Sequence, residues 1–180
     1  VRSIDSPYQD TRLLMIPPYA ASAYASSYSS LVVPDDDYVA VSLHAYTPYD
    51  FAMGNGDHTT FSNKNKGDLD TLFSDIQYYF TDKDIPVVMG EFSASNFNNT
   101  EARCDWATYY LTWTKKLGIP CVLWDNNAIT NSVSASEAHG YVNRSDNTWY
   151  EASEPVVDAM MTVMQDNSVV WGSESHLHSW

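Results

Sequence analysis

The sequence predicts an α/β fold built on a parallel sheet, either a barrel or a doubly wound sheet. Four short segments have the length and the Val, Ile, Leu and Met content of buried strands: Leu13–Ile16, Tyr38–Leu43, Pro86–Met89 and Ile119–Leu123. Helical patterns lie between and after them, which is the alternation that parallel sheets require. Glu91 stands just beyond the third segment, after Gly90, where parallel α/β enzymes carry reacting residues.

Three helices are expected from apolar spacing and end signals. The first has its apolar residues at helical intervals, Leu69, Leu72, Phe73, Ile76 and Phe80. The second runs from about Glu101 to Leu117, with lysines at its negative end before Gly118. The third opens at Ser153 and has Pro155 in its first turn. Each helix would pack an apolar face on the sheet.

Composition limits the class of protein. The chain has 180 residues, of which 44% are apolar and 14% aromatic, so it can bury a core. A net charge of -14 disfavours nucleic acid as a partner. No apolar stretch approaches the roughly 20 residues that span a bilayer, so no membrane partner is expected. Cys104 and Cys121 fall in a predicted helix and a predicted strand, and free core thiols are expected.

Two long connections follow predicted strands, and both would lie at the end of the sheet where parallel folds build sites. They are Thr47–Gly67 and Asp125–Ala152. Plain solvated loops are the alternative. Their aromatic residues favour a site for at least part of them: Tyr49, Phe51, Phe61, Tyr141 and Trp149.

Polar residues at the second and third strand ends are the candidate catalytic groups. Strand alternation places His44 and Tyr46 on one face, and Glu91 ends the next strand. A lone histidine here is more often structural, and Glu91 alone could be a helix cap or a surface carboxylate. Their combination favours a site in which Tyr46 donates a hydrogen bond that keeps the Glu91 carboxylate ionised.

A tryptophan and an asparagine after the fourth strand are the candidate sugar-binding groups. The flat face of Trp124 suits the apolar face of a pyranose ring, and Asn126 and Asp125 could reach hydroxyls. Trp124 could instead fill the core. The neighbouring polar residues favour the sugar.

These motifs resemble glycoside hydrolase family 5, especially its bacterial and anaerobic-fungal endoglucanases. The resemblance rests on His44-Ala45-Tyr46, Val87–Phe92 and Leu123-Trp124-Asp125-Asn126, which look like the motifs of the family's sixth, seventh and eighth strands. Residues 14–22 resemble its fifth strand and loop. The resemblance implies that Glu91 is the nucleophile, Tyr46 its hydrogen-bonding partner and His44 a neighbour of the cleavage point. It also implies that Trp124 lies beneath the sugar ring at the cleavage point and that Asn126 contacts a neighbouring glucose. Ser93 stands where the family usually has glycine.

The resemblance further implies a (β/α)8 TIM barrel of which this chain carries roughly strands 5 to 8. A full barrel needs roughly 250 residues, and the family's acid/base glutamate has no counterpart here. We therefore expect residues 1–165 to be the C-terminal half of a catalytic domain, residues 166–180 to be a tail, and an N-terminal half, in the same or a separate chain, to be the partner.

The implied function is that of a retaining endo-β-1,4-glucanase, which cleaves internal bonds of plant cell-wall glucans without a cofactor or metal. Its partner would be a β-1,4-glucan polysaccharide or oligosaccharide, and it would be secreted or part of a cell-surface multi-enzyme complex. A non-catalytic glycan-binding or assembly fragment is the alternative class. Xyloglucan, mixed-linkage glucan and mannan are alternative substrates.

Overall fold

The computed structural model describes residues 1–54, 58–129 and 137–174. Its centre is a four-stranded sheet in the order β1-β2-β3-β4, and every neighbouring pair is parallel. The strands are β1 Leu14–Ile16, β2 Val39–His44, β3 Val87–Phe92 and β4 Cys121–Leu123. All four predicted strands are therefore confirmed, and β2 and β3 continue far enough to include His44 and Glu91.

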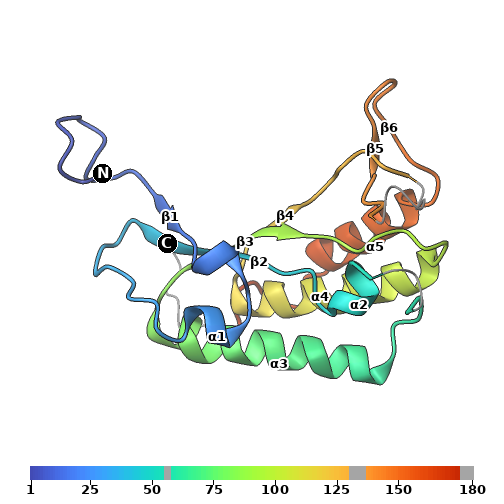
Figure 1. Cartoon of the computed structure of the whole chain (residues 1–180), viewed down its shortest axis with the longest axis horizontal. Coiled ribbons are helices and arrows are strands. Elements are labelled where there is room, and N and C mark those ends of the chain that lie inside the picture. The colour runs from blue at the N-terminus through green and yellow to red at the C-terminus, as the bar shows by residue number, and fades with distance from the viewer. Residues whose placement is uncertain (55–57, 130–136, 175–180) are drawn as a thin grey trace.

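Three long helices cover one side of this sheet (Figure 1). They are α3 Asn63–Tyr79, α4 Thr100–Leu117 and α5 Glu154–Gln165. The short elements are two 3-10 turns, Tyr19–Ala21 and Thr81–Lys83, the helices α1 Ala25–Tyr28 and α2 Tyr49–Ala52, and a hairpin of β5 Val142–Asn143 and β6 Thr148–Trp149. The hairpin and the residues before β1 project to the other side, at opposite ends of the molecule.

The two faces of the sheet differ in exposure. Leu43 and Met89 point toward the helices and are fully buried in the main core. Met15 and Val122, at alternate positions of the edge strands, are 50% and 56% exposed. Within the described part of the chain, β1 and β4 each have one unpaired edge. The helix-facing side is thus packed, while the opposite side carries apolar side chains in contact with solvent.

Two of the predicted connections contain more regular structure than expected. Helix α3 begins at Asn63, because Ser62 Oγ accepts a hydrogen bond from the Asn65 N–H while Asn65 Oδ1 accepts one from the Ser62 N–H. This reciprocal cap satisfies two amide groups at the helix start. The connection after β2 also contains α2, and the one after β4 forms the β5–β6 hairpin.

The end of α5 is held by a buried lysine of α4. The ammonium group of Lys115 donates to the carbonyls of Val163, Met164 and Asp166 at 2.8, 3.1 and 2.6 Å. Lys115 is only 5% exposed, and its charge lies at the negative end of α5. The helix is therefore fixed to α4 at the point where it ends.

Part of the expected C-terminal tail packs on the helices. The N–H of Gly172 donates to the carbonyl of Lys115, and Lys116 pairs with Glu174 at 3.2 Å. Gln77 of α3 also donates to the carbonyl of Glu174. Gly172 and Glu174 thus contact α3 and α4, while the boundary of the catalytic domain at residue 165 stays a prediction. The tail expected at residues 166–180 also contains His176 and His178, which lie outside the described residues.

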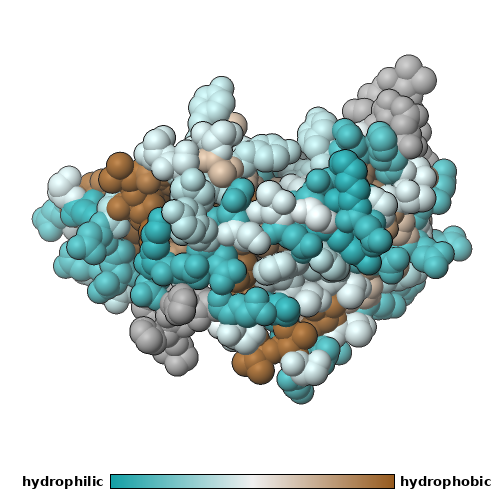
Figure 2. Space-filling model, turned by 90° about the horizontal axis from the view of Figure 1, so that it is seen from below, coloured by the Kyte–Doolittle hydropathy of each residue, from teal (hydrophilic) through white to brown (hydrophobic). Residues whose placement is uncertain are grey.

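The outer face over α3 is mostly hydrophilic (Figure 2), as the net charge of -14 suggests. No helix in the described ranges is long and apolar enough to cross a bilayer. Cys104 and Cys121 are both free thiols, as expected, and burial raises the pKa of Cys121 to about 12.

Candidate active site

Glu91 is the centre of the site, and two neighbouring side chains lie against the same oxygen of its carboxylate. The Tyr46 hydroxyl donates to Glu91 Oε2 at 2.7 Å, and His44 Nδ1 lies 3.3 Å from that oxygen. Glu91 Oε1 is left without either contact. The three predicted catalytic residues are therefore brought together on one face of the sheet, and one carboxylate oxygen is held while the other remains available.

The strand register explains this meeting. His44 is paired with Glu91 where the β2–β3 register shifts after Leu43, and the Ala45 N–H donates to the Glu91 carbonyl at 3.0 Å. A bulge of this kind redirects side chains next to active sites. Burial is the main cause that raises the pKa of Tyr46 above its ordinary value, followed by the hydrogen bond to Glu91 and the charges of Glu91 and Glu137. The Tyr46 hydroxyl thus stays protonated and can donate.

Gly90 leaves room for the close packing around Glu91. A Cβ atom at position 90 would lie 2.8 Å from Ser42 Oγ and 3.2 Å from His44 Nε2. The first distance is shorter than packed carbon and oxygen atoms allow. Glycine at this position lets β2 bring His44 over β3, directly beside Glu91.

Two aromatic residues of α4 hold the segment that carries Tyr46. The indole N–H of Trp106 donates to the Thr47 carbonyl at 2.9 Å, and the hydroxyl of Tyr110 lies 3.3 Å from the Ala45 carbonyl. Both side chains are fully buried. The backbone on each side of Tyr46 is therefore anchored to a helix in the core, which limits how far the tyrosine ring can move.

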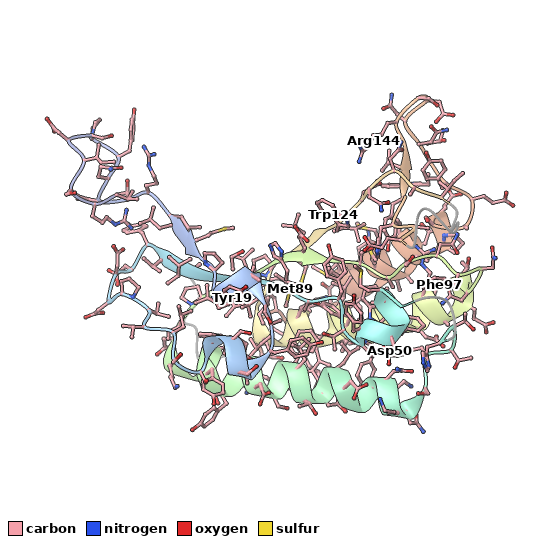
Figure 3. All side chains as sticks on the ribbon, viewed as in Figure 1. Tyr19, Asp50, Met89, Phe97, Trp124 and Arg144 are labelled. Atoms are coloured by element: carbon pink, nitrogen blue, oxygen red, sulfur yellow. The ribbon has the colours of Figure 1, made fainter. Side chains whose placement is uncertain are left out.

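Trp124 directly follows β4 and is 41% exposed. Its N–H donates to the Phe92 carbonyl at 3.0 Å, so its backbone continues the pairing of β4 with β3 next to Glu91. The residue lies on the side of the sheet that faces away from α3 (Figure 3). The expectation that Trp124 is not a core residue agrees with this exposure.

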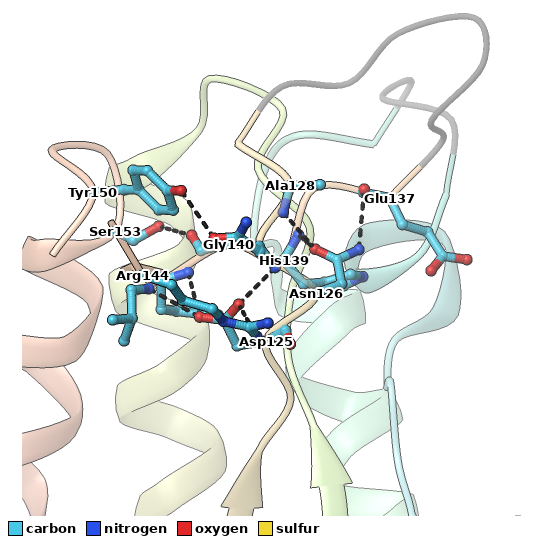
Figure 4. A network of polar contacts seen from close by, with 12 residues as sticks. Asp125, Asn126, Ala128, Glu137, His139, Gly140, Arg144, Tyr150 and Ser153 are labelled. Atoms are coloured by element: carbon cyan, nitrogen blue, oxygen red, sulfur yellow. Dashed lines mark hydrogen bonds and ion pairs between the residues drawn. The ribbon is translucent and has the colours of Figure 1, made fainter. Parts of the chain in front are cut away.

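Asp125 has a structural role that its sequence position did not reveal (Figure 4). Its Oδ2 accepts hydrogen bonds from the N–H groups of Tyr141 and Val142 at 3.0 and 2.9 Å. Its Oδ1 accepts hydrogen bonds from the Asn127 N–H and from the guanidinium group of Arg144. Burial acts to raise the pKa of Asp125, but the backbone hydrogen bonds and Arg144 hold it below its ordinary value. Both oxygens are thus used to fasten the β5–β6 hairpin behind Trp124.

Asn126 organises the same loop. Its Oδ1 accepts the N–H groups of Ala128 and His139 at 3.0 and 3.1 Å, and its Nδ2 donates to the Glu137 carbonyl at 3.3 Å (Figure 4). The second hydrogen of the Nδ2 group is not used in these contacts. Contact of Asn126 with a glucose unit stays a prediction, and it would have to use that hydrogen.

Sequence reasoning missed a cluster of buried polar side chains that lies next to the Asp125–Asn126 loop. Ser93 and His139 are fully buried, and Ser93 Oγ lies 2.8 Å from His139 Nδ1 and 3.2 Å from the Tyr141 hydroxyl. Arg103, also fully buried, donates to the Ala94 carbonyl and lies over the Tyr141 ring. The only signal in the sequence was Ser93, which departs from the glycine expected there.

Comparison with known proteins identifies the family. The family model for cellulase, glycosyl hydrolase family 5, matches residues 1–129. The chain belongs to glycosyl hydrolase family 5. Endoglucanase A of Clostridium longisporum is 44% identical over 144 residues, which cover 78% of this chain and 27% of that protein. The Glu91, Tyr46 and His44 cluster therefore lies within a family 5 chain.

Solved structures extend the comparison to the fold. A GH5-4 broad specificity endoglucanase from Ruminococcus flavefaciens has a TM-score of 0.88 and 54% identity, and the match covers 92% of this chain and 48% of that one. A GH5-4 broad specificity endoglucanase from Ruminococcus champanellensis with bound cellotriose has a TM-score of 0.78 and 34% identity, with 87% and 44% covered. This chain spans less than half the length of these relatives. It is part of a (β/α)8 barrel.

Proposed function

We propose that this chain supplies the nucleophile half of the active site of a retaining endo-β-1,4-glucanase. The observation that carries the proposal is the pair of contacts on Glu91 Oε2, 2.7 Å from the Tyr46 hydroxyl and 3.3 Å from His44 Nδ1. A carboxylate held by one oxygen, beside an exposed tryptophan at the next strand end, suits attack on a sugar ring.

The reaction takes place in two displacements. Glu91 Oε1 attacks the anomeric carbon, the bond from that carbon to the glycosidic oxygen breaks, and an acid protonates the departing oxygen. Water then attacks the resulting glycosyl ester after giving a proton to the same acid residue, and Glu91 is released as a carboxylate. Tyr46 keeps the attacking group oriented in both steps.

The acid/base residue belongs to the N-terminal half of the barrel in this proposal. A retaining pair of carboxyl groups stands about 5 to 5.5 Å apart. The second carboxyl could not be Asp125, because both its oxygens accept hydrogen bonds from the hairpin loop. The exposed Met15 and Val122 face of the sheet supports the same conclusion, because a second half of the barrel would cover it.

The substrate we propose is a β-1,4-glucan, and Trp124 would stack on the sugar at the cleavage point. The related R. champanellensis structure contains cellotriose, which supports this class. A non-catalytic glycan-binding fragment would need the Trp124 platform but no tyrosine hydrogen-bonded to Glu91. The cluster of Glu91, Tyr46 and His44 therefore favours an enzyme. Because cell-wall glucan lies outside the cell, we also propose that the protein is secreted.

The test compares Glu91→Gln with wild type in the complete barrel, formed by this chain and the N-terminal half. Reducing-sugar release from soluble β-1,4-glucan should fall by several orders of magnitude, while binding of the glucan is retained. NMR of the first product formed by wild type should show the β-anomer, as retention requires. Near-normal turnover by the variant, or an initial α-anomer, would refute the proposal.

A further inference from the structure

His139 is buried in the loop between β4 and α5 with one ring nitrogen unpaired. Its Nδ1 lies 2.8 Å from Ser93 Oγ, while Nε2 has no hydrogen-bond partner among the described residues. The side chain is fully buried. Unpaired polar atoms in such positions are uncommon because their desolvation is not compensated. The hydrogen bond to Ser93 is therefore the one side-chain hydrogen bond of the His139 ring among the described residues.

The contacts define the form of the ring. If Nδ1 carries the hydrogen, it donates to Ser93 Oγ, the serine hydroxyl can donate to the Tyr141 hydroxyl at 3.2 Å, and Nε2 is a bare acceptor. A doubly protonated ring would leave a charged N–H group unpaired in the interior. The neutral ring is the form that fits.

His139 also touches both sides of the candidate active site. Its ring meets the Tyr46 ring edge-on, with 5.8 Å between the ring centroids. Its backbone N–H donates to Asn126 Oδ1 at 3.1 Å, two residues after Trp124. Ser93, its partner, stands two residues after Glu91 on the chain. Three contacts of His139 thus connect the segments of the site: a side-chain hydrogen bond to Ser93 near Glu91, a ring contact with Tyr46 and a backbone hydrogen bond to Asn126 near Trp124.

We propose that Ser93 and His139 are a pair of positioning residues, which fix the Tyr46 ring and the loop behind Trp124 relative to Glu91. The inference rests on the proposed function, because it assigns a role in that same site. The serine hydroxyl provides a contact that the glycine usual in the family cannot make.

The charged and titratable groups around His139 come from several elements. Arg103 of α4 opposes a second positive charge, and Asp125 after β4 favours one. Burial is the largest cause that lowers the pKa of His139, to about 4. Tyr46 and Tyr141 also face it, through the ring contact and through Ser93. Their hydroxyls carry no charge that would stabilise a protonated ring, so His139 is neutral at neutral pH.

The experiment uses the complete barrel and measures kcat and KM on soluble β-1,4-glucan, together with thermal midpoints. Ser93→Ala removes the hydroxyl, and His139→Phe keeps a ring beside Tyr46 without the hydrogen bond. Each should lower kcat about tenfold, because small displacements of reacting groups are costly, with KM changed less than twofold. The double variant should be no slower than His139→Phe, because both changes remove one contact.

Thr114→Val is the matched control, because Thr114 is a buried residue whose hydroxyl contacts the Leu111 carbonyl of α4 and the Cys121 thiol, and neither partner belongs to the candidate active site. It should leave kcat unchanged even where its thermal midpoint falls as far as that of Ser93→Ala. The positioning role would be refuted if the control lost as much kcat as Ser93→Ala and His139→Phe. It would also be refuted if the loss in the double variant equalled the product of the two single losses. Unchanged kcat in Ser93→Ala would do the same while leaving the proposed function intact. An inactive wild type would overturn both.

Discussion

Trp106 of α4 donates its indole N–H to the carbonyl of Thr47, the residue that follows Tyr46. This bond joins the helix layer to the segment that orients Glu91. Trp106 and Tyr110 hold the backbone on either side of Tyr46, whereas the Tyr46 hydroxyl holds the Glu91 carboxylate, so backbone anchoring and carboxylate orientation depend on different groups. The effect of losing the hydroxyl alone can therefore be predicted.

Tyr46→Phe should reduce catalysis far more than stability. The ring can still pack against His139, and only a hydrogen bond to a carboxylate is lost, worth about 1.5 to 3 kcal/mol. We expect kcat to fall by about 10² on that scale. Measurement of kcat and the thermal midpoint on one preparation checks this. A parallel collapse of folding would contradict the separation of backbone anchoring from carboxylate orientation.

Trp124→Ala should weaken glucan binding and turnover. Because the side chain is 41% exposed, its loss should cost less stability than the roughly 3 to 5 kcal/mol of a buried tryptophan deletion. Denaturant unfolding and the KM for cello-oligosaccharides are the two measurements. Trp171, which is 47% exposed and lies in the segment packed near the end of α4, offers a control. Trp171→Ala should leave KM unchanged.

The 180-residue chain by itself should show no hydrolysis of soluble β-1,4-glucan. Without an acid at the second position, the loss of general acid catalysis costs about 10² to 10⁴ in rate. Activity should return when the N-terminal half is added. Reducing-sugar assays with and without that half test this, and the Glu91→Gln chain excludes a contaminating enzyme. Robust activity of the chain alone would mean that Glu137, whose charge acts on Tyr46, must be re-examined as an acid.

Stability should fall as pH decreases from about 6.5 to 4, with His139 as one cause. Its folded-state pKa of about 4 lies below the ordinary value of 6.5, so the unfolded chain binds more protons across this window. This difference between the two pKa values corresponds to a change of at most about 3 kcal/mol in the free energy of unfolding. Urea unfolding of wild type and His139→Phe at several pH values gives the two slopes. The variant should have the smaller slope, and equal slopes would exclude His139 as the cause.

The sequence predicted the strands because each is a short apolar run, and it predicted the cluster around Glu91 because strand ends in a parallel sheet meet at one edge. The start of α3 was missed because Asn63 to Gly67 are polar and the cap uses Asn65, where a glutamate or glutamine is the usual signal. The β5–β6 hairpin was missed because its strands have two residues each and depend on Asp125.

The role of His139 could not be predicted from local pattern. Its partner Ser93 lies 46 residues away, and nothing in the composition of the loop distinguishes this histidine from an exposed one. Asp125 was read as a group for sugar hydroxyls for a similar reason. The amide groups that it binds belong to Tyr141 and Val142, and only the folded loop brings them near.

The ammonium group of Lys115, enclosed by three carbonyls at the end of α5, has a chemical consequence. Amine-reactive reagents need an accessible, deprotonated nitrogen, and this one is shielded, whereas the side chain of Lys64 is 82% exposed and open to attack. Acylation of Lys115 therefore requires α5 to detach first. Because the three carbonyls belong to Val163, Met164 and Asp166, the labelling rate of this one amine would report how often the C-terminal end of α5 separates from α4.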